Sequence, residues 1–198
     1  GKHEFDTSNQ FEAPKQSQEQ ANLQESSKQH LSQACHYYQQ AIEIQSEISY
    51  LHYEYAQTLA KISDLSDHEE KKQYLNQCLD CLTQLISSEL FHELEPNLIR
   101  DTSLDLAYVH SKSGDFLEGR KLLGLLQAAY PGYWRDYYIK ACHYVYLADQ
   151  KTNQDADEHY SLAIKALKKS LSFTQAQTKI IASIQISQDF KRFPSKYR

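Results

Sequence analysis

The sequence predicts an all-α protein built from consecutive antiparallel helix hairpins, and three observations lead to this fold class. Apolar residues recur at intervals near 3.6 residues through almost all of residues 23–187. Only 5 Gly and 4 Pro occur among 198 residues, and an all-β fold needs many more turn residues. The periodic segments are separated by short polar loops, and helices joined in this way pack antiparallel.

Four helices are predicted in the first half of the chain, over about residues 24–46, 48–63, 68–87 and 97–112. Their apolar stripes are, in order, Leu31, Ala34, Tyr38, Ala41, Ile42 and Ile44; Leu51, Tyr55, Ala56, Leu59 and Ile62; Tyr74, Leu75, Cys78, Leu79, Leu82 and Leu85; and Leu98, Leu104, Ala107 and Tyr108. The polar run Ser63–Asp67 separates the second helix from the third, and Ser66 or Asp67 can cap the third. The segment from Ser87 to Pro96 is expected to be irregular or a short helical turn.

Four more helices are predicted over about residues 115–129, 133–149, 155–171 and 174–187. Their stripes are Phe116, Leu122, Leu123, Leu125 and Leu126; Tyr137, Tyr138, Ala141, Tyr144, Val145 and Leu147; Ala156, Tyr160, Ala163, Ile164, Ala166 and Leu167; and Ile180, Ile181, Ile184 and Ile186. Gly114 supplies the left-handed backbone that ends a helix. We therefore expect one helical domain over residues 23–187.

Both ends of the chain differ in composition from this domain. Residues 1–22 are rich in Gln, Ser and Glu and carry too few apolar side chains to offset the entropy of ordering, which predicts a flexible polar leader that can be helical near its end. Residues 188–198, QDFKRFPSKYR, form a basic and aromatic tail.

An internal repeat runs through the helices. A small residue followed by other apolar residues at +4 and +7 recurs in the second helix of a pair, as Ala34-Tyr38-Ala41, Gly119-Leu123-Leu126 and Ala156-Tyr160-Ala163, and Tyr74-Cys78-Cys81 matches in spacing only. A small residue recurs in the first helices as Ala56, Ala107 and Ala141, and the last step is 141 − 107 = 34 residues. Small residues let two helices approach closely, and the larger ones fill the space between pairs.

Residues 104–131, LDLAYVHSKSGDFLEGRKLLGLLQAAYP, resemble a tetratricopeptide repeat, and a weaker resemblance covers residues 24–187. The resemblance implies an α-solenoid of about three and a half helix pairs closed by a C-terminal capping helix. It also implies a concave groove lined by the first helices. Carried over position by position, the groove set is Tyr50, Tyr53, Gln57, Lys61, Asp101, Leu104, Tyr108, Lys112, Arg135, Tyr138, Cys142 and Tyr146.

The groove set predicts a non-catalytic scaffold or adaptor that binds a peptide or helix of another protein. The chain has 15 Tyr, whose broad apolar ring and hydroxyl suit peptide contacts. Lys61, Lys112 and Arg135 favour an acidic partner. The Lys/Asn clamp that some relatives of this repeat family use for a chaperone's acidic C-terminus is not matched, since those positions hold Tyr53, Gln57, Leu104, Tyr108, Tyr138 and Cys142.

Other classes of function find less support in the sequence. No nucleophile, phosphate-loop or zinc-protease motif occurs, so we expect neither an enzyme nor a cofactor. The net charge of −5 and the absence of a long apolar run argue against nucleic-acid binding and a membrane span. Cys78 and Cys81 leave a metal or redox site open, although core filling is the preferred interpretation, with reduced thiols in the cytoplasm. A regulatory or oligomerisation domain of a larger protein is the other alternative.

Overall fold

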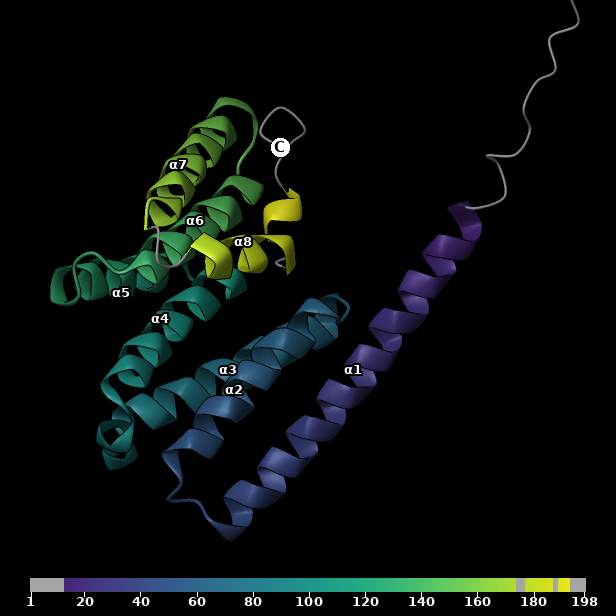
Figure 1. The fold of residues 1–198 in the computed structure, drawn as a ribbon, viewed down its shortest axis with the longest axis vertical. Helices are drawn as coiled ribbons and strands as arrows, with labels where there is room; N and C mark the ends of the chain where they lie inside the picture. Colours follow the sequence, from purple (N-terminus) through teal and green to yellow (C-terminus); the bar gives the residue numbers. More distant parts are fainter. Residues whose placement is uncertain (1–12, 174–176, 187–188, 193–198) are drawn as a thin grey trace, which may run out of the picture.

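The computed structural model describes residues 13–173, 177–186 and 189–192, and all of its regular elements in these ranges are helical. The helices follow one another as a series of hairpins that turns from α1 at one end to α7 and α8 at the other (Figure 1). Their bounds are α1 Ala13–Ile44, α2 Ser49–Asp64, α3 His68–Ser87, α4 Pro96–Ser113, α5 Phe116–Ala129, α6 Trp134–Asp149, α7 Asn153–Leu171 and α8 Gln177–Ile186, with short 3-10 helices η1 Glu89–Glu93 and η3 Phe190–Arg192.

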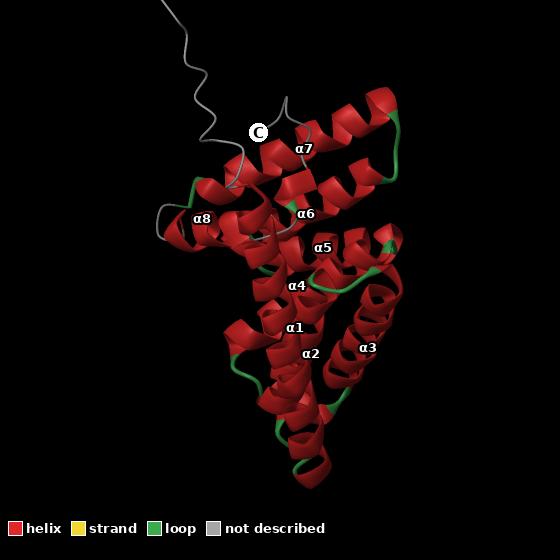
Figure 2. Ribbon diagram, turned by 90° about the vertical axis from the view of Figure 1, so that its right-hand side faces the viewer, coloured by secondary structure: helices red, strands yellow, loops and turns green. Residues whose placement is uncertain are grey.

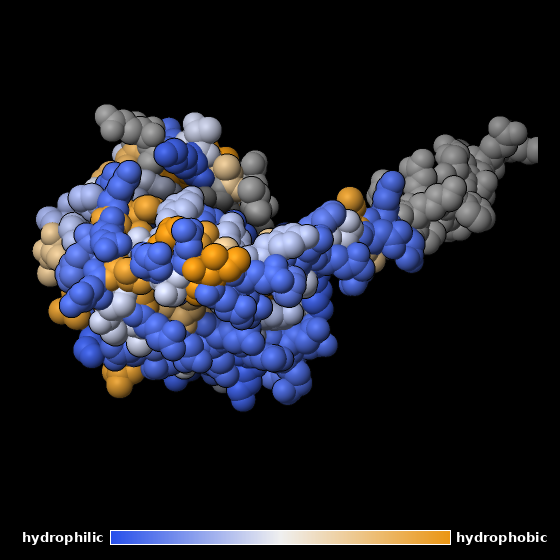
Figure 3. Space-filling model, turned by 90° about the horizontal axis from the view of Figure 1, so that it is seen from below, coloured by the Kyte–Doolittle hydropathy of each residue, from blue (hydrophilic) through white to orange (hydrophobic). Residues whose placement is uncertain are grey.

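The predicted helices agree with the observed ones to within a few residues, except at the first. Helix α1 begins at Ala13, so residues 13–22 at the end of the predicted leader are helical. Gln, Glu, Ala and Lys dominate this stretch, and these residues have high intrinsic helix propensity. The early part of α1 extends away from the body and is mainly hydrophilic, with Leu23 65% exposed (Figures 1 and 3). Residues 1–12 of the predicted leader and residues 188 and 193–198 of the predicted tail lie outside the described residues.

Two predicted helix ends have the expected geometry. The carboxylate of Asp67 accepts a hydrogen bond from the Glu70 backbone N–H at 3.0 Å, which caps α3. Gly114 ends α4 with a φ of 97°, in the left-handed region that residues with a Cβ atom rarely adopt. Both signals were local, because a cap depends on residues that are neighbours in the chain.

Three helix hairpins, α2/α3, α4/α5 and α6/α7, make up most of the packing, and they lie one after another along the molecule (Figure 2). The small residues of the repeat lie at their contacts: Ala56, Ala107, Ala141 and Ala163 are at most 1% exposed. Gly119 of α5 approaches α4 so closely that a Cβ there would lie 2.5 Å from Ser111 Oγ. The tight packing predicted at these small positions is therefore confirmed.

The cysteines of the predicted Cys78–Cys81 pair belong to the core between α2 and α3. Cys78 Sγ donates to the Ala56 carbonyl oxygen at 3.2 Å, and Cys81 Sγ donates to the His52 carbonyl oxygen at 3.3 Å. Burial raises the pKa of both thiols, to about 11 for Cys81, so both keep their protons in this core. The core-filling interpretation of these two residues is confirmed.

None of the helices in the described part of the chain combines the length and apolar character that a membrane crossing requires.

Candidate binding groove

A cavity of about 570 Å³ lies among helices α1, α2, α3, α4, α6 and α8. Most of its lining comes from α2, α4 and α6. Helix α1 adds Leu31, α3 adds Cys78 and Leu82, and α8 adds Ala182. The lining residues are Leu31, Gln57, Ala60, Lys61, Asp64, Leu65, Cys78, Leu82, Asp105, Tyr108, Val109, Trp134, Arg135, Tyr138, Ile139, Ala182 and Asp189. We call this cavity the groove.

Five residues of the predicted groove set line the groove: Gln57, Lys61, Tyr108, Arg135 and Tyr138. They come from α2, α4 and α6, which are the first helices of the three hairpins. The topology therefore brings together residues that are up to 81 positions apart in the chain.

The other seven predicted residues lie elsewhere. Tyr50 is 51% exposed near the start of α2, whereas Tyr53 packs with Leu85 and Leu94 in a separate core cluster. Leu104 and Cys142 have no exposed surface, so neither side chain can touch a partner in this structure. The remaining three residues, Asp101, Lys112 and Tyr146, make the contacts described below. The resemblance to the repeat family assigned these residues by position alone. It could not tell exposed from buried side chains, because their exposure depends on how far each helix is rotated about its axis.

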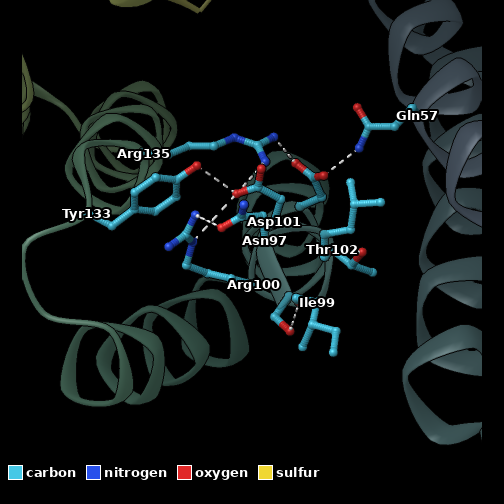
Figure 4. Close-up of polar contacts among 11 residues, drawn as sticks. Gln57, Asn97, Ile99, Arg100, Asp101, Thr102, Tyr133 and Arg135 are labelled. Atoms are coloured by element: carbon cyan, nitrogen blue, oxygen red, sulfur yellow. Dashed lines mark hydrogen bonds and ion pairs between the residues drawn. The ribbon is translucent and has the colours of Figure 1, made fainter. Parts of the chain in front are cut away.

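Polar side chains tie α4 to α2 and α6 beside the groove (Figure 4). The carboxylate of Asp105, which is 5% exposed, accepts hydrogen bonds from the Gln57 amide and the Arg135 guanidinium. Arg135 also pairs with Asp101 at 3.3 Å, and Asp101 accepts a hydrogen bond from the Tyr133 hydroxyl at 3.0 Å. Burial raises the pKa of Asp105 to about 6 against the opposing effect of Arg135, so this carboxylate is ionised at neutral pH.

A second carboxylate near this network is buried without a hydrogen bond. Both oxygens of Asp136 lack a hydrogen-bond partner among the described residues, and burial raises its pKa to about 6. The guanidinium of Arg100, which favours the ionised form, lies 3.3 Å over the ring of Tyr133.

Two of the three cations predicted to attract an acidic partner are neutralised within the chain. Arg135 is paired with Asp101 and Asp105, and Lys112 lies 2.6 Å from Asp64 with its side chain fully buried. Lys61 is exposed at the rim of the groove. The sequence could not reveal these pairings, since each joins helices that are distant along the chain.

The end of the chain contributes a contact that the sequence analysis missed. Asp189, 3% exposed, accepts hydrogen bonds from the hydroxyls of Tyr108, at 3.1 Å, and Tyr146. Phe190 packs edge-on against the Tyr138 ring, with centroids 5.6 Å apart. The sequence signal was an acidic residue beside an aromatic one in a segment predicted to be a basic and aromatic tail.

The phenols that hold Asp189 are neutral donors. Burial, followed by the neighbouring carboxylate and phenol, raises the pKa of Tyr108 and of Tyr146 well above 10. The Cys142 thiol beside them is also buried, and its pKa is raised well above the ordinary value. This end of the groove therefore binds a carboxylate through hydrogen bonds from uncharged groups.

Within the described residues, no group of three or more His, Cys, Asp or Glu side chains is placed to hold a metal ion. Comparison of the chain with protein-family models, curated proteins and solved structures finds no match. Apolar side chains line the groove together with a few polar ones, and two phenols from different helices converge on the Asp189 carboxylate.

Proposed function

We propose that this chain is a non-catalytic scaffold or adaptor, built as a tetratricopeptide-like solenoid, whose groove binds a peptide or helix of a partner protein. The three hairpins and the buried small residues at their contacts support the solenoid. The same organisation is compatible with a regulatory domain of a larger protein, in which the partner segment would belong to the same assembly.

The observation that carries the proposal is the groove itself. Its volume is about 570 Å³, and apolar side chains that keep part of their surface exposed, among them Leu31, Leu65 and Tyr138, line it. Polar groups from α2, α4 and α6 line it as well, so they can orient a bound segment while the apolar side chains supply the affinity.

The test is selection of random peptides displayed on phage against the full chain, followed by fluorescence anisotropy with the enriched peptides. We expect Tyr138→Ala and Lys61→Glu each to weaken binding by at least about 10-fold. Lys165→Glu, the same charge change at an exposed position of α7, should leave binding unchanged. Circular dichroism of each variant checks that helicity is retained.

Two outcomes contradict the proposal. The first is that no peptide is enriched over an unrelated helical protein of similar size. The second is that enriched peptides bind the groove variants and the α7 control equally well, which would place their site elsewhere.

A further inference from the structure

We propose that the groove recognises a partner segment in which a carboxylate residue is directly followed by an aromatic residue, and that Asp189–Phe190 occupies this subsite in the free chain. The inference rests on the proposed peptide-binding function and names the chemistry of its partner.

The carboxylate position is built from two helices. Tyr108 of α4 and Tyr146 of α6 direct their hydroxyls at opposite oxygens of Asp189, Tyr108 at Oδ2 and Tyr146 at Oδ1. The two hydroxyl oxygens lie 3.5 Å apart, and the two rings pack against each other with centroids 6.2 Å apart. This geometry presents a pair of donors to one carboxylate, as a bidentate acceptor requires.

A carboxylate is also what the site lacks when Asp189 leaves. The phenols are buried and keep their protons, and withdrawal of Asp189 removes the hydrogen bond that each of them donates to it, which is costly in a buried site. The lining of the groove contains the cations Lys61 and Arg135 and the carboxylates Asp64, Asp105 and Asp189. Without Asp189, the two cations and the two remaining carboxylates balance, so a partner carboxylate meets no net negative charge.

The aromatic position is equally defined. Phe190 is 9% exposed, and its ring meets the Tyr138 ring at 64° in a core cluster that includes Ala141 and Val145. An edge-on aromatic contact of this kind contributes beyond simple burial. Tyr138 also lines the groove, so the ring that contacts Phe190 is shared with the groove.

The chain's own segment is attached in a way that permits exchange with a partner. Helix η3 is only three residues long, and α8 before it leaves Ile181 48% exposed. Short elements with few buried groups open at lower free energy than the core of a domain. A partner segment with the same two side chains would accept hydrogen bonds from the same hydroxyls and pack against the same Tyr138 ring. It would also make contacts with the other residues of the groove.

The experiment opens the site in the full chain with Asp189→Ala/Phe190→Ala and titrates it with a fluorescein-labelled peptide, Ser-Gln-Asp-Phe-Lys-Arg, which copies residues 187–192. We expect micromolar binding to the opened variant and at least about 10-fold weaker binding to the wild type, whose own segment competes at high effective concentration. Peptides with Asp→Asn or Phe→Ala should each bind the opened variant at least about 10-fold more weakly.

A second variant keeps the test decisive if the opened chain loses helicity. Tyr146→Phe retains the ring and removes one donor, so amide hydrogen exchange of residues 189–192 should become faster than in the wild type. In the opened variant, Tyr146→Phe should reduce the preference for Asp over Asn in the peptide. Unchanged exchange and an unchanged preference would overturn the inference.

The outcomes separate this inference from the proposed function. If phage-selected peptides bind the groove but the Asp-Phe peptide does not, the inference is overturned and the proposed function stands. If neither binds, both are overturned. A concentration-dependent dimer that the peptide dissociates would identify the tail of a second copy as the occupant, and would overturn the assignment to a partner.

Discussion

Gly119→Ala is expected to destabilise the chain because the added methyl group has no space between α5 and α4. Its Cβ would lie 2.5 Å from Ser111 Oγ and 3.1 Å from the Ala107 carbonyl oxygen. Ser111 is 1% exposed, and its hydroxyl is 2.8 Å from both the Ala107 oxygen and His143 Nδ1. The hydroxyl therefore cannot rotate away without losing these hydrogen bonds.

The magnitude follows from two opposing contributions. Replacement of Gly by Ala within a helix gains about 1 kcal/mol of intrinsic helix stability. Overpacking in a tight contact costs about 1–3 kcal/mol. We expect a net decrease of about 1 kcal/mol in the free energy of unfolding.

Gly124 provides the matched control on the same helix. It is exposed, and a Cβ there would meet nothing within 4 Å. Gly124→Ala should therefore gain about 1 kcal/mol, so that the same substitution at two positions of α5 differs by about 2 kcal/mol.

Urea unfolding followed by circular dichroism measures this difference. Ser111→Ala in the Gly119→Ala background should recover about 1 kcal/mol in a double-mutant cycle, since it removes the nearest atom. Equal stability of Gly119→Ala and Gly124→Ala would refute the close approach of the two helices.

Three further predictions concern charged and titrating groups. Arg135→Ala should lower the free energy of unfolding by about 3 kcal/mol in urea, because Asp105 would remain buried without its cation. Asp67→Ala should cost about 1 kcal/mol in thermal unfolding through loss of the α3 cap, and Asp67→Asn should restore most of it. Burial lowers the pKa of His143 to about 4, so only the unfolded chain takes up its proton as pH falls below 6.5; the stability contributed by the neutral ring, on the order of 3 kcal/mol, is lost between pH 6.5 and 4. The wild type therefore loses stability on acidification that His143→Gln does not lose. The difference between their free energies of unfolding should shrink or change sign as pH falls, and a difference that stays constant with pH would contradict the neutral, buried ring.

Asp105 and Asp136 act on stability in the opposite direction to His143. Burial raises both pKa values to about 6, so the native chain binds protons more readily than the unfolded chain between about pH 4 and 6. Their contribution to stability grows as pH falls through this range. These carboxylates partly mask the effect of His143 in the pH dependence of wild-type stability. The effect is therefore measured as the difference in the free energy of unfolding between the wild type and His143→Gln.

Sequence reasoning recovered the helices because their signals are local. The 3.6-residue stripes, the Asp67 cap and the Gly114 end each depend on residues within one or two turns of each other. The hairpin contacts at Ala56, Ala107 and Ala141 were also accessible, since small residues at a fixed period mark where helices approach. The start of α1 was less well defined from the sequence, because the turns before Leu23 have helix propensity but no apolar stripe.

The tertiary structure alone decided which predicted groove residues line the cavity. Leu104, Cys142 and Tyr146 share the helix faces of Asp105, Tyr108 and Tyr138, yet a small rotation of each helix separates buried side chains from accessible ones. Lys112 pairs with Asp64, which is 48 positions away in the chain. Asp189 accepts hydrogen bonds from Tyr108 and Tyr146, which are 81 and 43 positions away. Periodicity within a helix carries no information on such distances, because they are set by how complete hairpins stack and by where the end of the chain returns to them.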